Sequence, residues 1–229
     1  MTAPLLFVAA DPRECEPWVA HWKGLEKLSL PVHWARAGKW RDSPVIALAN
    51  GAGWERAYSA VQTVRDARAV CNIGFCGALD EALHIGEIVL ATSIQGPGGD
   101  YKVASPESPA AATGPLISVS RIAQTAAEKR DLRKSGGLVV EMEAAGAARA
   151  SEELGVPFFC VRAVSDLANE DFANNFNDFF MSDGRIHIPR LLAGALHSPV
   201  KRFGELIRLS GRAALASKNL GEFLANCTF

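Results

Sequence analysis

The chain has 229 residues, of which 48% are hydrophobic and 21% charged, enough for one large α/β domain with a substantial core. No apolar stretch is long enough to span a bilayer, and residues 1–13 lack the basic start and long apolar core of a signal peptide. Residues 1–184 carry 17 basic and 23 acidic side chains, whereas residues 185–229 carry seven basic and two acidic ones. This basic excess is modest and has no aromatic stacking motif, so nucleic acid is not an expected partner.

Cysteine and histidine usage indicates neither disulfides nor a metal centre. The five cysteines form an odd, scattered set without a CxxC pair, and the five histidines show no ligand spacing. We therefore expect reduced thiols in a cytoplasmic protein, with no metal and no cofactor. The cysteines are Cys15, Cys71, Cys76, Cys160 and Cys227.

Short apolar runs alternate with segments rich in helix formers along most of the chain. The runs predict strands at Leu5–Ala10, Val32–Ala37, Val45–Ala49, Ala69–Ile73, Glu87–Ile94, Leu138–Met142 and Phe158–Val164. Helices are predicted at Glu14–Leu25, Trp54–Asp66, Ala123–Lys134 and Glu143–Leu154. The alternation predicts a single α/β domain over residues 1–229, with a mixed, largely parallel central sheet flanked by helices.

Two regions depart from this pattern. Gln95–Pro115 contains four prolines and four glycines without an apolar period, which predicts a long loop. After Asp166 the chain becomes polar and aromatic, and two or three helices are expected to run to the end. Residues 185–229 are then a basic helical tail that we expect to pack on the domain.

Two predicted turns near the start of the chain carry polar or small residues. Glu14 falls in the first turn of a helix at the carboxyl edge of the sheet, where an acid is favoured by the helix dipole even without a catalytic role. Residues 50–57 place small residues before a helix, which suits a tight turn or close approach of a ligand. Arg56 occupies the third glycine position of GxGxxG, so a dinucleotide dehydrogenase is disfavoured.

A third turn follows the strand predicted at Ala69–Ile73. Its small residues allow two interpretations: close packing of strand and helix through glycine, or a turn whose backbone amides face a substrate. The second interpretation makes Phe75, Cys76 and Gly77 substrate-binding candidates.

Residues 139–166 form the most informative stretch, a strand–helix–strand unit with acids at the carboxyl ends of both strands. Ligands of open α/β sheets bind at those ends, so Glu141, Glu143 and Asp166 are expected to line one pocket. Arg162 interrupts an apolar run and needs a carboxylate partner, because an unpaired buried charge is costly. Glu141 is a candidate for that structural ion pair.

Taken in order, these motifs resemble those of the nucleoside phosphorylase/nucleosidase superfamily over nearly the whole chain. The core motifs resemble methylthioadenosine/S-adenosylhomocysteine nucleosidases, whereas residues 116–143 and the tail resemble a hopanoid-associated phosphorylase-like branch. The matching residues are Glu14, GAGWERA at 51–57, NIGFCGAL at 72–79, IGEIV at 85–89, VVEMEA at 139–144 and VRAVSD at 161–166.

The resemblance implies a role for each matched position around the base and the sugar. Asp166 would hydrogen-bond N7 of a purine and act as general acid for the leaving base, oriented by Ser165. Glu143 would bind the ribose hydroxyls, with the Met142 side chain packed against the sugar. Such acid catalysis increases the reaction rate roughly 10²–10⁴-fold. It requires a dry pocket or neighbouring carboxylates to raise the pKa of Asp166 and keep it protonated near pH 7.

The same resemblance favours hydrolysis over phosphorolysis. Glu14 would position or deprotonate a water nucleophile, with Arg162 close by, and it stands where phosphorylases would have a phosphate-binding arginine. Asn72 and Phe75 occupy positions where those enzymes hold phosphate with an arginine and a serine. Phe75 also replaces the serine of typical nucleosidases.

Three questions stay open at the level of sequence. The alternatives to a purine nucleosidase are a phosphorylase for a lipid-linked nucleoside such as adenosylhopane, and a non-catalytic nucleoside-binding protein of the same fold. The basic tail either packs on the sheet with solvated basic faces or touches an anionic membrane surface weakly. The expected partners are thus a small-molecule nucleoside and, from the resemblance, a second copy of the chain in a homodimer.

Overall fold

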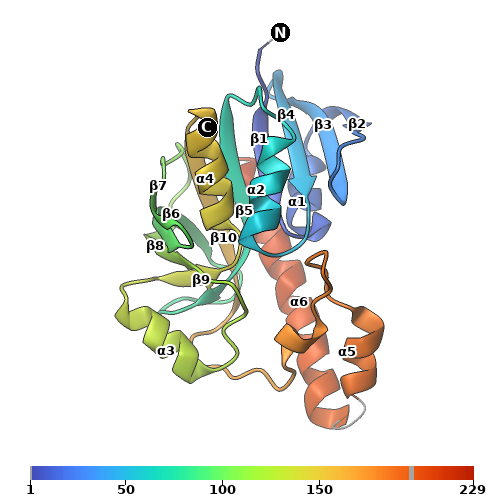
Figure 1. The fold of residues 1–229 in the computed structure, drawn as a ribbon, viewed down its shortest axis with the longest axis vertical. Helices are drawn as coiled ribbons and strands as arrows, with labels where there is room; N and C mark the ends of the chain where they lie inside the picture. Colours follow the sequence, from blue (N-terminus) through green and yellow to red (C-terminus); the bar gives the residue numbers. More distant parts are fainter. Residues whose placement is uncertain (1, 196–198) are drawn as a thin grey trace.

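The structure is a computed structural model that describes residues 2–195 and 199–229 (Figure 1). Its strands are β1 (Leu5–Ala9), β2 (Lys23–Lys27), β3 (Trp34–Trp40), β4 (Ser43–Ala49), β5 (Ala69–Ala78), β6 (Ile88–Gly96), β7 (Gly99–Lys102), β8 (Ala112–Ser118), β9 (Val139–Glu141) and β10 (Phe158–Asp166). Its helices are α1 (Pro12–Val19), α2 (Trp54–Gln62), α3 (Ala126–Lys134), α4 (Ala144–Leu154), the 3₁₀ turn η1 (Phe176–Phe179), α5 (Ile188–Ala195) and α6 (Pro199–Leu224).

All the strands belong to one mixed sheet, as the sequence predicts. Its centre is parallel: β1 pairs with β4 and β5, and β5 pairs with β10. On one side, β3 and β2 lie antiparallel beyond β4. On the other side, β6 pairs antiparallel with β10, and β8 pairs in parallel with both β6 and β9. The long strand β5 pairs with β10 and β1 along its length, and at Gly77 and Ala78 it also pairs with β9. The carboxyl end of β5 is therefore the place where several strand ends meet.

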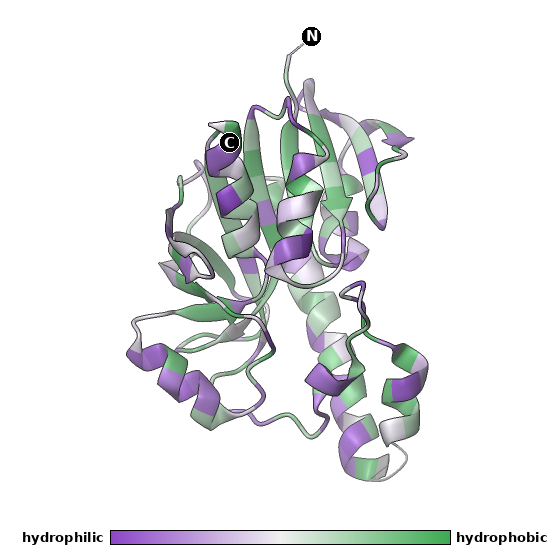
Figure 2. Ribbon diagram, in the orientation of Figure 1, coloured by the Kyte–Doolittle hydropathy of each residue, from purple (hydrophilic) through white to green (hydrophobic). Residues whose placement is uncertain are grey.

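Helices cover both faces of the parallel strands. Helices α2 and α4 pack together on one face, and α1 packs against α6 on the other (Figure 1). In β1, Leu6 and Val8 enter one core, whereas Leu5 and Phe7 enter the core on the opposite face. Burial on both faces explains why the central strands read as continuous apolar runs, which appear as green strands in Figure 2.

Two stretches differ clearly from the prediction. The helix predicted at Glu14–Leu25 ends at Val19, and β2 follows as an edge strand whose five residues are all exposed. Such a strand has no buried face and so no apolar alternation to reveal it. The loop predicted at Gln95–Pro115 instead contains β7, a hairpin partner of β6, and the start of β8. Glycines and prolines there mark turns between short strands rather than one long loop.

The C-terminal segment divides into two parts. In the second half of α6, Ala216, Leu220 and Leu224 are fully buried in the core shared with α1 and the sheet. The first half of α6 and α5 extend away from the sheet (Figure 1). Over residues 2–195 and 199–229, no helix combines the length and apolar character needed to cross a membrane.

Candidate active site

Asp166 ends β10 beside the carboxyl end of β5. A bulge between Val164 and Asp166 shifts the register so that Asp166 faces Gly77, and a Cβ at Gly77 would lie 2.8 Å from Asp166 Oδ1. The bulge therefore re-aims the carboxyl, and glycine is the residue that leaves room for it. Ser165 Oγ lies 3.0 Å from Asp166 Oδ2 and 3.2 Å from the Cys76 carbonyl, within donating distance of both.

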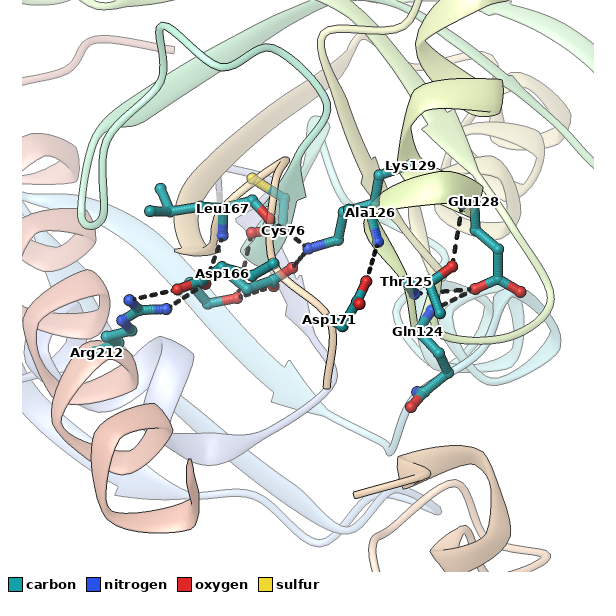
Figure 3. Close-up of polar contacts among 12 residues, drawn as sticks. Cys76, Gln124, Thr125, Ala126, Glu128, Lys129, Asp166, Leu167, Asp171 and Arg212 are labelled. Carbon is teal, nitrogen blue, oxygen red and sulfur yellow. Dashed lines mark hydrogen bonds and ion pairs between the residues drawn. The ribbon is translucent and has the colours of Figure 1, made fainter. Parts of the chain in front are cut away.

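The charged partner of Asp166 is Lys129 of α3, which sequence reasoning missed. Its Nζ donates to Asp166 Oδ1 and, at 2.7 Å, to the Leu167 carbonyl, and it lies 5.2 Å from the centre of the Phe172 ring (Figure 3). Of the two environments expected for Asp166, a dry pocket or neighbouring carboxylates, the structure shows burial, and the immediate charged contact is a cation. Nothing in the local sequence separates Lys129 from the other basic residues of this helix.

Helix α3 is attached to the segment that follows Asp166. A capping box of Thr125 and Glu128 starts the helix. The Ala126 amide donates to Asp171 Oδ1 at 2.7 Å (Figure 3). The Phe172 amide donates to the Gln124 carbonyl at 2.9 Å. These bonds fix the position from which Lys129 reaches β10.

Glu141 forms the structural ion pair that its position suggested. The Arg162 guanidinium donates through Nη2 to Glu141 Oε2 and to Asn72 Oδ1, and both charged side chains are buried. Glu141 also accepts the backbone amides of Glu143 and Ala144, at 2.9 Å and 2.9–3.1 Å. Its carboxylate thereby fixes the start of α4.

Glu143 sits at the N-terminus of α4, where Oε1 accepts the Gly53 amide at 3.0 Å. Burial, with a smaller contribution from the neighbouring Glu141 charge, raises the pKa of Glu143 to about 8. This shift favours the protonated form of the carboxyl. Met142 lies half-buried between these two acids.

Glu14 is both a helix cap and a buried acid of the site. Its Oε2 accepts the amides of Ala10 and Asp11 at 2.9 Å, and its Oε1 accepts the Phe75 amide at 2.8 Å. Burial raises the pKa of Glu14 despite these bonds, which makes it a stronger base when ionised. A Cβ at Gly74 would lie 2.7 Å from Glu14 Oε1, so glycine is required there.

Strand β5 links the two halves of the site. Its Asn72 bonds Arg162, its Phe75 amide bonds Glu14, and its Gly77 faces Asp166. The Cys76 thiol instead points into the core with a pKa raised well above its usual value by burial, so only its backbone remains available to a ligand. Every predicted site residue therefore lies along β5 or on an element bonded to it.

A cleft of about 590 Å³ opens next to this group, at the N-terminus of α2. It is lined by polar side chains, among them His33, Asn50, Glu55 and Arg56, and none of the predicted catalytic residues borders it. Gly53, which bonds Glu143, belongs to the same turn. Within the part of the chain that the structure describes, no group of three or more His, Cys, Asp or Glu side chains is arranged to hold a metal ion.

Comparisons with known proteins identify the relatives of this chain. A sequence model described as the phosphorylase superfamily matches residues 4–117 and 101–196. A 5'-methylthioadenosine/S-adenosylhomocysteine nucleosidase of Staphylococcus aureus (strain JH9) is 29% identical over 140 residues, which cover 48% of this chain and 61% of that protein. The chain thus matches about three-fifths of the length of this curated relative.

Solved structures share the fold over almost the whole chain. The Neisseria meningitidis 5'-methylthioadenosine/S-adenosylhomocysteine nucleosidase, in complex with methylthio-immucillin-A, has a TM-score of 0.68 at 19% identity and covers 96% of this chain and 98% of its own. Futalosine hydrolase of Helicobacter pylori has a TM-score of 0.73 at 14% identity, with 98% and 96% covered.

Proposed function

Because this chain belongs to the phosphorylase superfamily, we propose that it is an enzyme that cleaves the N-glycosidic bond of an adenosine-type purine nucleoside, by hydrolysis rather than phosphorolysis. The observation that carries this proposal is the placement of three buried acids around the carboxyl half of β5: Glu14 accepts the Phe75 amide, Asp166 faces Gly77, and Glu143 follows β9, which pairs with β5 at Gly77. The names of the similar nucleosidases support the same chemistry.

On the base side, Asp166 is the general acid. As the bond between C1' and N9 breaks, its electron pair moves into the base, and N7 takes a proton from the Asp166 carboxyl. Ser165 restrains the carboxyl by its contact with Oδ2, and the glycine opposite leaves the base room to approach. Proton donation of this kind accounts for roughly 10²–10⁴-fold of the rate.

On the sugar side, the raised pKa of Glu143 gives the carboxyl a proton to donate to a ribose hydroxyl at neutral pH. Once it ionises, the same carboxyl favours positive charge developing on the sugar ring. Met142, half-buried next to it, is placed to pack against the sugar.

On the nucleophile side, the charges favour water over phosphate. Glu14 is an acid with a raised pKa, suited to accept a proton from water and to repel phosphate. Arg162 is the nearby cation, but Glu141 already neutralises it. Phe75, whose amide holds Glu14, brings no hydroxyl to bind phosphate.

The test is to incubate the protein with methylthioadenosine, adenosylhomocysteine, adenosine and inosine, with and without phosphate, and to measure the free base. We expect the free base to be released without phosphate. The rate of this release should fall ~10²–10⁴-fold in the Asp166→Asn variant. Product that forms only with phosphate would show a phosphorylase. No product from any nucleoside, together with tight binding, would favour the non-catalytic alternative that Phe75 raises.

A second candidate is action on a lipid-linked nucleoside, and the first half of α6 is the observation that favours it. Val200 and Ile207 are 92% and 73% exposed there, and Lys201 and Arg208 lie beside them in sequence. Basic and apolar side chains together suit an anionic lipid surface. Flotation with vesicles rich in anionic lipid tests this, with Val200→Glu/Ile207→Glu as the control, because truncation would remove the buried end of α6. Equal flotation of both proteins, or none, would contradict membrane contact.

Two expectations from the sequence stay predictions. A homodimer is implied by the family resemblance and is tested by light scattering of the purified protein. Cytoplasmic localisation is expected from the free cysteines, all five of which are buried.

A further inference from the structure

Lys129 is a buried cation with partners on several sides. The side chain is 1% exposed, and its ammonium donates to the Asp166 carboxylate and the Leu167 carbonyl. Two of its three donors are thus used in hydrogen bonds, and the Phe172 ring lies 5.2 Å away on a further side. A charge removed from water this completely is tolerated only where such partners are built around it.

The pairing with Asp166 is specific among the charges nearby. Arg212 of α6 faces the same region, but it forms a two-bond ion pair with Glu170, at 2.5 and 2.9 Å. The Ser165 hydroxyl, 3.0 Å from Asp166 Oδ2, is the uncharged side-chain group in contact with the carboxyl. Lys129 is therefore the cation that responds directly to the charge on this carboxyl.

We propose that Lys129 is a positioning residue that stabilises the carboxylate which Asp166 becomes when it gives its proton to the departing base. This inference rests on the proposed function. Because the ion pair in the structure holds Asp166 as a carboxylate, Asp166 first takes a proton from solvent as the nucleoside binds. This proton passes to N7 as the bond between C1' and N9 breaks, and the negative charge restored on Asp166 is met by the Lys129 ammonium, which keeps all its protons. The ion pair in the structure corresponds to the state after this transfer.

Lys129 acts through Asp166 and does not contact the substrate. Its head is enclosed by Asp166, Leu167 and Phe172, so a nucleoside reaches the carboxyl without touching the ammonium. The bonds from Ala126 to Asp171 and from Phe172 to Gln124 hold α3 against the segment after β10. They keep the ammonium in place while Asp166 changes charge.

The experiment compares two leaving groups. A purine needs protonation as it leaves, whereas the nitrophenolate of 4-nitrophenyl β-D-riboside leaves unprotonated. We expect Lys129→Met to lower kcat for the purine nucleoside by ~10-fold or more, within the range set by general acid catalysis, and to leave kcat for the nitrophenyl riboside within ~2-fold. Lys129→Arg should restore part of the purine rate. Lys134→Met, on the exposed end of the same helix, is the control and should change neither rate.

If Lys129→Met loses activity on both substrates, the role of Lys129 is structural. If its purine rate is unchanged, Lys129 has no role in the reaction. Either result overturns the inference. The double variant Lys129→Met/Asp166→Asn removes both charges and leaves no unpaired buried charge. It therefore provides a test even if the single variant misfolds. It should be no slower on the purine than Asp166→Asn, and an additive loss would contradict action through Asp166. If Asp166→Asn itself keeps the wild-type purine rate, the proposed function fails as well.

Discussion

At the scale of single residues, Glu143 couples folding to pH. The carboxyl is 8% exposed, and burial together with Glu141 makes its charged form unfavourable, while Arg162 only partly compensates. Glu14, buried beside the same arginine, has its pKa shifted in the same direction. The folded protein therefore holds protons on these acids at pH values where the unfolded chain has lost them.

We predict that the stability of the protein falls as the pH rises from about 4.5, the ordinary pKa of a glutamate, to about 8, the raised pKa of Glu143. Below this window both states are protonated, and above it the folded state bears a buried charge. Thermal unfolding followed across the window should show a decreasing Tm. Glu143→Gln should flatten the decrease, leaving the part due to Glu14. A Tm that rises with pH in the wild type, or an equal slope in the variant, would contradict this account.

Two residue pairs of the site differ in how far the sequence predicts them. The pair of Glu141 and Arg162 follows from sequence, because β9 and β10 flank one helix and a buried arginine needs an acid. The contact of Lys129 with Asp166 does not, because it depends on how α3 is tied to the segment after β10, through backbone bonds such as that of Phe172. Sequence spacing carries no signal for such a bond.

At the scale of elements, buried strands were predictable from the sequence and exposed strands were not. The strands β1, β5 and β10 read as apolar runs because both of their faces are covered. The strand β2 is held by pairing with β3 alone, and in β7 only Tyr101 is buried. With so little burial, neither carries a pattern that separates it from a loop.

Close packing of α1 against α6 depends on Gly221. A Cβ there would lie 2.6 Å from Pro17 Cβ and 3.0 Å from the Trp18 amide nitrogen, whereas a Cβ at Gly211 of the same helix meets nothing within 4 Å. We predict that Gly221→Ala destabilises the protein by roughly 1–3 kcal/mol, because the helices must move apart. Gly211→Ala should stabilise it by about 0.5–1 kcal/mol through helix propensity. Urea unfolding measures both, and shifts of the same sign would show that α1 and α6 are not packed this closely.

At the scale of the whole molecule, the C-terminal helix joins the basic end of the chain to the sheet. The second half of α6 contributes Leu220 and Leu224 to the same core as Phe7 of β1 and Val161 of β10, the strand that ends in Asp166. The first half of the helix bears exposed apolar side chains away from that core. One continuous helix therefore connects these exposed side chains to the core beneath the strand that carries the candidate acid.

This arrangement predicts that the tail and the sheet unfold together. Leu220→Ala opens a cavity at a fully buried position and should cost roughly 2–5 kcal/mol, lowering the Tm of a single calorimetric transition. Ile207→Ala, on the same helix at 73% exposure, should change the stability by less than about 0.5 kcal/mol. If Leu220→Ala instead splits the transition and leaves the main part at the wild-type temperature, α6 is a separate unit, and its covering of β10 contributes nothing to holding Asp166 in place.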